Sequence, residues 1–168
     1  VVAADRMIFQ AMADEFKEGA LLFRPDEGVF ALMPNLDVLP KARAAYERAI
    51  AEHPEQEAMR LAHENFLNDA VVILFTSGRG DDARRLFEEI RSRLPSPNLE
   101  DFLCRSVVGE GRALSREEAS SVLESLEYQS VFWQALGENE RSNGFARLAE
   151  ICRKQIAADS AEKVPSLK

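Results

Sequence analysis

Apolar residues recur at helical spacing in one segment of this chain after another, and proline and glycine separate the segments. Between about residues 4 and 23 one apolar stripe runs at successive i+4 positions, through Ile8, Met12, Phe16 and Ala20. Further helices are predicted at about residues 40–53, 55–77, 81–94, 98–108, 115–136 and 141–158. No run alternates strictly, so strands are not expected. The pattern predicts an all-α fold of about seven helices.

The length and composition favour one folded domain. A chain of 168 residues with 46% apolar and 30% charged residues is able to bury a core. We expect a single helical domain over residues 1–158 and a flexible tail over residues 159–168. A formal net charge of -8 at pH 7 argues against nucleic acid or a membrane surface as partner. The densest basic group is interpreted as a solvated helix face, formed by Arg84, Arg85, Arg91 and Arg93.

Residues 24–40 interrupt the helical pattern. Three prolines and Gly28 prevent a continuous helix through this segment, so a long ordered loop is expected. The loop carries large apolar side chains that are costly to leave in water, so it either covers the domain as a hydrophobic lid or binds a partner. The candidate partner-binding residues are therefore Val29, Phe30, Leu32, Met33 and Leu36.

A short pattern occurs twice along the chain. It consists of a small residue, an aromatic or large apolar residue four positions later, a small or apolar residue three positions after that and a final proline, at Ala42, Tyr46, Ala49 and Pro54 and again at Ala83, Phe87, Ile90 and Pro95. A weaker third copy lies at Ala119, Leu123 and Leu126. The pattern resembles the second helix of a tetratricopeptide repeat. The resemblance covers about residues 38–158 and implies antiparallel helix pairs in an irregular right-handed stack that binds other proteins.

No residue pattern predicts catalysis, a cofactor or a metal site. Neither His53 nor His63 has a histidine three or four residues away or a glutamate three residues before it. The turn at residues 76–80 follows a helix and lacks the lysine of a phosphate-binding loop. Cys104 and Cys152 fit buried thiols, and the sequence leaves open whether they form a disulfide.

Three hypotheses of function follow. The leading one is a non-catalytic module that binds a protein partner, as yet unidentified, through a groove between helix pairs or through the segment from Val29 to Leu36. The second, suggested by a start at Val1 rather than Met, is a structural spacer in a membrane-tethered or exported larger protein, which leaves the compartment undecided. The third is a helical ligand-binding protein or enzyme with an unrecognised pocket, a hypothesis that a deep pocket containing His63 would favour.

Overall fold

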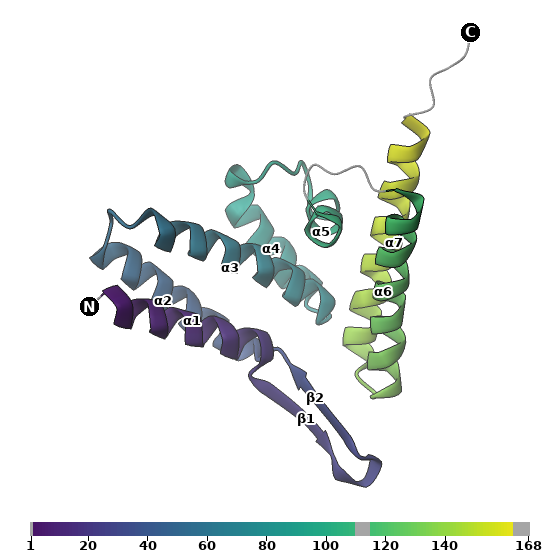
Figure 1. The fold of residues 1–168 in the computed structure, drawn as a ribbon, viewed down its shortest axis with the longest axis horizontal. Helices are drawn as coiled ribbons and strands as arrows, with labels where there is room; N and C mark the ends of the chain where they lie inside the picture. The colour runs from purple at the N-terminus through teal and green to yellow at the C-terminus, as the bar shows by residue number, and fades with distance from the viewer. Residues whose placement is uncertain (1, 110–114, 163–168) are drawn as a thin grey trace. The chain divides into compact units, whose positions relative to one another are not determined.

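The computed structural model describes residues 2–109 and 115–162, and in this part of the chain the fold is all-α apart from one β-hairpin (Figure 1). The chain divides into two compact units, Val1–Ile73 and Leu74–Lys168, and each is described by itself. Among the described residues, no helix is both long and apolar enough to cross a lipid bilayer.

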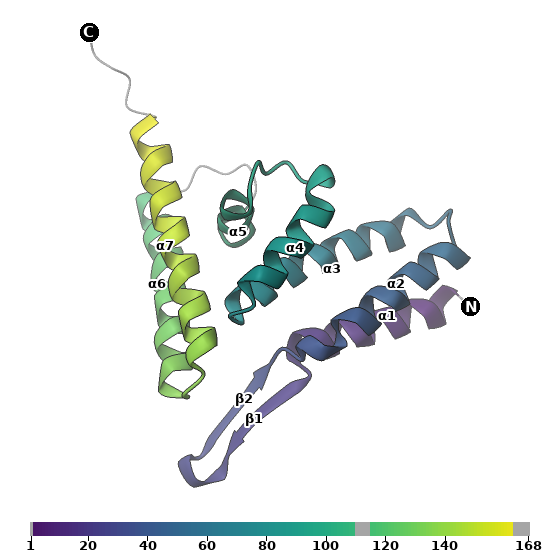
Figure 2. The ribbon, with the colours of Figure 1, turned by 180° about the vertical axis from the view of Figure 1, so that it is seen from behind.

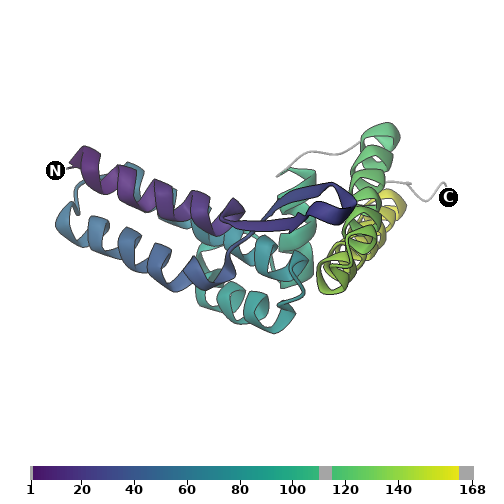
Figure 3. The ribbon, with the colours of Figure 1, turned by 90° about the horizontal axis from the view of Figure 1, so that it is seen from below.

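In the first unit, residues 2–73 form three α-helices and the hairpin. Helices α1 and α2 pack against each other and lie side by side in Figures 1 and 3, and α3 continues beyond this unit for its last turn. The helices are α1 (Val2–Glu18), α2 (Leu39–Glu52) and α3 (Glu57–Thr76). A short 3-10 turn at Leu36–Val38 leads into α2, where Pro40 occupies the first turn.

The hairpin replaces two features that the sequence predicted. Strands β1 (Ala20–Arg24) and β2 (Val29–Met33) pair antiparallel, so the expectations of no strands, of a helix reaching residue 23 and of a loop throughout residues 24–40 were wrong. A 3-10 turn at Pro25–Glu27 and Gly28, in the left-handed region at φ 64°, reverse the chain. Both strands are short apolar runs with little alternation, and such runs resemble buried helix segments.

The buried face of α1 also differs from the predicted stripe. Phe9, Ala13 and Phe16 are buried, whereas Ile8 is exposed, so of the predicted positions only Phe16 lies fully in the core. Phe9 stacks on Tyr46 of α2 with ring centroids 4.4 Å apart. An aromatic ring buries more apolar area than an aliphatic side chain and so determines which face of the helix turns inward.

Aromatic rings form the core of the first unit. Tyr46 stacks not only on Phe9 but also on Phe66 and His63 of α3, at centroid distances of 5.1 and 5.2 Å. Phe16 meets Phe66 edge-on at 5.5 Å. Of the predicted core positions of α2, Ala42, Tyr46 and Ala49 are buried and Ala45 is half-buried.

The Tyr46 hydroxyl makes the stability of this unit sensitive to alkaline pH. Burial, reinforced by the charges of Asp14 and Asp69, raises the pKa of Tyr46 from 10.0 to about 12. The folded protein therefore holds this proton more tightly than the unfolded chain, and the resulting stabilisation is complete below pH 10 and lost as the pH rises to about 12. This pKa shift of Tyr46 corresponds to a stabilisation of the folded state by at most about 3 kcal/mol.

We expect the free energy of unfolding of the wild type to fall, relative to that of Tyr46→Phe, as the pH rises through this window. Denaturant unfolding of both proteins at a series of pH values measures the difference, and the comparison cancels the titration of lysines and of Tyr128. A difference that stays constant from neutral pH to the end of the window would contradict the prediction.

In the second unit, residues 74–109 and 115–162 form four α-helices besides the end of α3. Helices α6 and α7 lie side by side along their length, and α5 packs against α7 (Figures 1 and 2). Their bounds are α4 (Gly80–Ile90), α5 (Leu99–Val108), α6 (Arg116–Ala135) and α7 (Asn139–Glu162). Of the predicted core positions of α4, Ala83, Leu86, Phe87 and Ile90 are buried, whereas Leu94 lies beyond the end of the helix and is half-buried. Helix α7 runs past residue 158, so residues 159–162 are helical although the sequence predicted a flexible tail there. Residues 163–168 of the predicted tail lie outside the described residues.

Local side-chain signals set the helix ends of this unit. Ser115 and Glu118 form a capping box at the start of α6, with each side chain bonded to the backbone N–H of the other residue. Asn98 caps α5 by accepting a hydrogen bond from the Asp101 N–H at 2.9 Å. These bonds satisfy N–H groups that have no partner inside the helix.

Helix α7 passes very close to the end of α3. Gly144 is buried, and a Cβ atom at this position would lie 2.5 Å from the carbonyl oxygen of Thr76 and 2.8 Å from that of Phe75. Glycine is the residue that allows this approach, although it costs about 1 kcal/mol of helix stability relative to alanine. On α5 and α7, Cys104 and Cys152 are both buried and are not joined in a disulfide.

Candidate functional site

The two strands present four large apolar side chains to solvent. The register pairs Leu21 with Leu32 and Phe23 with Phe30, so all four lie on one face of the hairpin. Their exposed fractions are 55% for Leu21, 50% for Leu32, 62% for Phe23 and 67% for Phe30. We call these four residues the hairpin face.

The hairpin separates the five residues that the sequence singled out. Phe30 and Leu32 belong to the hairpin face, whereas Val29 and Met33 are half-buried because successive side chains of a strand point to opposite faces. Leu36 lies beyond the strand, half-buried at the start of a 3-10 turn. The sequence missed Leu21 and Phe23 because that segment was expected to be helical.

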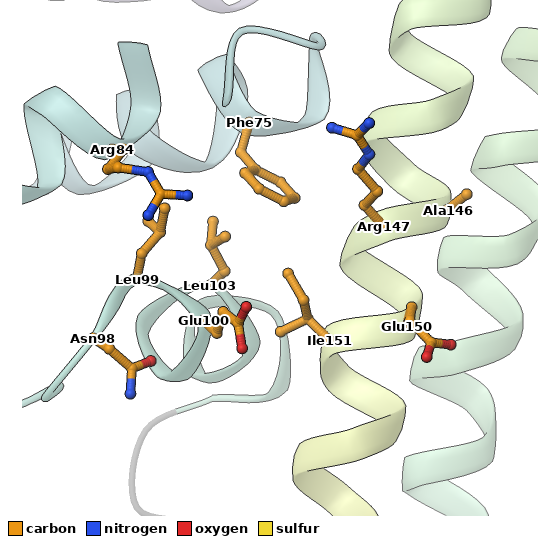
Figure 4. A pocket seen from close by; sticks show the side chains of 10 residues that line it. All are labelled: Phe75, Arg84, Asn98, Leu99, Glu100, Leu103, Ala146, Arg147, Glu150 and Ile151. Carbon is orange, nitrogen blue, oxygen red and sulfur yellow. The ribbon is translucent and has the colours of Figure 1, made fainter. Parts of the chain in front are cut away.

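A pocket of about 610 Å³ opens on the second unit (Figure 4). Its volume lies within the range of small-molecule binding sites. The end of α3, helices α4, α5 and α7, and the cap of α5 supply its lining, which consists of Phe75, Arg84, Asn98, Leu99, Glu100, Leu103, Ala146, Arg147, Glu150 and Ile151. A smaller pocket of about 140 Å³ shares Phe75 and Arg147 with it.

The floor of this pocket is apolar because of helix geometry. Leu99 and Leu103 are four residues apart on α5 and therefore share one face, which the cap at Asn98 aligns from the first turn. Figure 4 shows Phe75 between Arg84 and Arg147, with Ile151 of α7 facing the α5 residues. Apolar side chains from three helices thus surround the central space.

The charged residues that line the pocket are Arg84, Arg147, Glu100 and Glu150, and because Glu150 pairs with Lys154 and Arg153 outside the lining, the two arginines outnumber the one remaining acid, Glu100. Glu150 bonds to Lys154 at 3.2 Å and to Arg153 at 2.9 Å, and the bond to Lys154 and its charge are the main causes that lower the pKa of Glu150. Within the described residues, no carboxylate lies at ion-pair distance from Arg84 or Arg147. Sequence reasoning placed Arg84 on a solvated face, and it missed the pocket because the lining residues come from distant segments.

The two histidines occupy different surroundings in the first unit. His63 is buried and stacks on Tyr46, which fits a structural role. His53 Nε2 lies 2.9 Å from a carboxylate oxygen of Asp5, and one ligand atom each from His53, Asp5 and Glu52 lie within 4.8 Å of one another. Helical spacing could not reveal this group, because Asp5 comes from another helix.

Comparison with known proteins gives no relative: no family model, no curated protein and no solved structure matches the chain. The class of protein is therefore defined by the fold alone, as an all-α chain with one β-hairpin.

Proposed function

We propose that this protein is a non-catalytic interaction module that binds a protein partner on the hairpin face. The observation that carries the proposal is the pairing of Leu21 with Leu32 and of Phe23 with Phe30 on one exposed face. Contiguous apolar surface is costly in water, and its presence is typical of binding sites. Phenylalanine supplies a large contact area at a low cost in side-chain entropy, which suits it to the centre of an interface.

The backbone of the hairpin offers a second mode of contact. Among the residues that the structure describes, the sheet has two strands, so each strand has one outer edge whose N–H and C=O groups have no partner strand there. An extended segment of a partner could add a third strand there and place its own apolar side chains against the hairpin face. We therefore expect the partner to contribute an extended segment with apolar side chains.

A membrane is a weaker candidate for the occupant of this face. The turn that joins the two strands carries Asp26 and Glu27, both exposed, and the chain has a formal net charge of -8 at pH 7. Anionic lipid surfaces attract basic segments and repel acidic ones. A protein surface avoids this repulsion.

The helices fit the same function. We propose that they form antiparallel pairs in an irregular, right-handed, tetratricopeptide-like stack. Support comes from equivalent positions of the repeated pattern, since Ala42 and Ala83 are buried, as are Tyr46 and Phe87. In both copies of the pattern the helix ends before the proline, since α2 ends at Glu52 and α4 ends at Ile90. The alternative of a structural spacer predicts no specific partner for the hairpin face.

Site-specific photocrosslinking tests the proposed function. A benzophenone amino acid at position 30 should give one discrete covalent adduct in extract from the source cells, and Leu21→Ser with Leu32→Ser should abolish it. The same probe at position 128 is the matched control, because Tyr128 is an equally exposed aromatic residue on α6. The captured protein is then purified, and its affinity for the chain is measured.

We expect Phe30→Ser to weaken that affinity by about 30-fold, as the loss of a central aromatic contact costs about 2 kcal/mol. Tyr128→Ser should leave it unchanged. Equal adducts at positions 30 and 128, or an affinity that Phe30→Ser does not alter, would rule out the hairpin face as the docking surface. Binding to lipid vesicles without a protein adduct would assign the face to a membrane instead.

The pocket of the second unit favours a second candidate function, the binding of a small amphipathic anion. The apolar floor at Leu99, Leu103 and Ile151 suits a hydrocarbon group, and Arg84 and Arg147 at the rim suit a carboxylate or phosphate. This candidate corresponds to a helical ligand-binding protein, with the pocket here and not at His63.

A further inference from the structure

We propose that Asp5, Glu52 and His53 bind a divalent transition-metal ion of the zinc type, which would join the start of α1 to the end of α2. His53 Nε2 lies 2.9 Å from Asp5 Oδ2, and the three candidate ligand atoms lie within 4.8 Å of one another. The proposal is independent of the partner-binding role of the hairpin face.

Packing between the two helices places Asp5 opposite His53. Asp5 and Phe9 are four residues apart on α1 and so share one helix face, and His53 follows the last residue of α2, seven residues after Tyr46. The stack of Phe9 on Tyr46, at 4.4 Å, fixes the register of the two helices. The same register brings the carboxylate of Asp5 to the imidazole of His53.

The backbone around His53 is held in place. The His53 N–H donates to the Ala49 carbonyl at 3.0 Å, and the His53 carbonyl accepts from the Gln56 N–H at 3.0 Å. Only 14% of the His53 side chain and 22% of the Asp5 side chain are exposed. Two of the three ligands are therefore positioned before any ion binds, which reduces the entropic cost of binding.

The donor set indicates the kind of ion. One imidazole nitrogen with two carboxylate oxygens suits zinc, whereas magnesium and calcium prefer shells made of oxygen alone. Zinc–ligand bonds of about 2.0 to 2.1 Å in a tetrahedron place neighbouring ligand atoms about 3.4 Å apart. The contact between Asp5 and His53 needs to widen slightly, and Glu52, which is exposed, needs to turn inward.

The position at a helix end adds to the attraction. His53 is the C-cap residue of α2, and the last carbonyl groups of a helix carry partial negative charge. A cation at this end is stabilised by those carbonyls as well as by the two carboxylates. A water molecule would complete the tetrahedron, as in zinc sites with three protein ligands.

Calorimetric titration of the full chain with zinc chloride tests the site. We expect one ion per chain, with affinity reduced at least about tenfold by His53→Gln and by Glu52→Gln, since even the removal of groups that only orient a ligand has this effect. Glu55→Gln is the matched control, because Glu55 is an exposed acid close in sequence and outside the group. Magnesium chloride should give no comparable binding.

Thermal unfolding with and without zinc gives the second readout, because an ion that binds the folded state raises the melting temperature. We expect this rise to disappear in Glu52→Gln, whose exposed side chain can be changed without disturbing the metal-free fold. No binding of zinc to the wild type would overturn the proposal. Binding that survives unchanged in both His53→Gln and Glu52→Gln would also overturn it, since the ion would then lie elsewhere.

Discussion

Replacing Phe66 by alanine should lower the free energy of unfolding by about 3 to 5 kcal/mol, the range for removal of a buried phenylalanine. Phe66 is 2% exposed, meets Phe16 edge-on at 5.5 Å and stacks on Tyr46 at 5.1 Å. Each aromatic pair adds about 0.5 to 1.5 kcal/mol beyond the area that it buries. The loss should therefore fall in the upper part of this range.

Denaturant unfolding followed by circular dichroism measures this loss. The matched control is Phe30→Ala, the same chemical change at an exposed position of the hairpin face, and we expect it to alter stability by about 0.5 kcal/mol or less. Similar effects of the two substitutions would show that Phe66 does not lie at the centre of the aromatic core.

Replacing Phe87 by alanine should have a comparable effect on the second unit, again about 3 to 5 kcal/mol. Phe87 lies on the inner face of α4 with no exposed surface, and its ring packs against Phe102 of α5 at a centroid distance of 5.6 Å. Removal of the ring leaves a cavity between the two helices, and the surrounding side chains refill such cavities only in part.

Arg84→Ala on the same helix serves as the control for Phe87→Ala. The Arg84 side chain is exposed, and among the described residues it has no ion-pair partner, so its loss should change stability by about 0.5 kcal/mol or less. Both variants are compared with the wild type by denaturant unfolding. A loss under about 1 kcal/mol for Phe87→Ala would mean that the inner face of α4 has been misplaced.

The sequence predicted best those elements whose signals are local. The capping box at Ser115, the cap at Asn98 and the alanine and aromatic positions of α2 and α4 depend on residues within a few positions of one another. The hairpin and the inner face of α1 depend on partners distant in sequence. Phe9 faces the core because it stacks on Tyr46 of α2, and the spacing of apolar residues within α1 does not indicate this contact.

The candidate sites divide in the same way. Phe30 and Leu32 were found because a run of apolar residues in a segment rich in proline and glycine is unusual by itself. Their cross-strand partners required the register of the hairpin. The group formed by Asp5 and His53, like the pocket of the second unit, exists only after helices from separate segments have packed.

Gly144 offers a landmark for detecting distant relatives of this chain. Surface positions drift freely in evolution, whereas the backbone of α7 at this glycine lies against the carbonyl oxygens of Phe75 and Thr76, where even a methyl group would be too close. Gly78 lies close to α7 one turn earlier, because a Cβ atom at position 78 would lie 2.8 Å from the Cβ atom of Glu140. Gly78 follows the long apolar helix α3, and Gly144 lies inside α7. This pair of glycines is therefore a better guide to a sequence alignment than any surface motif.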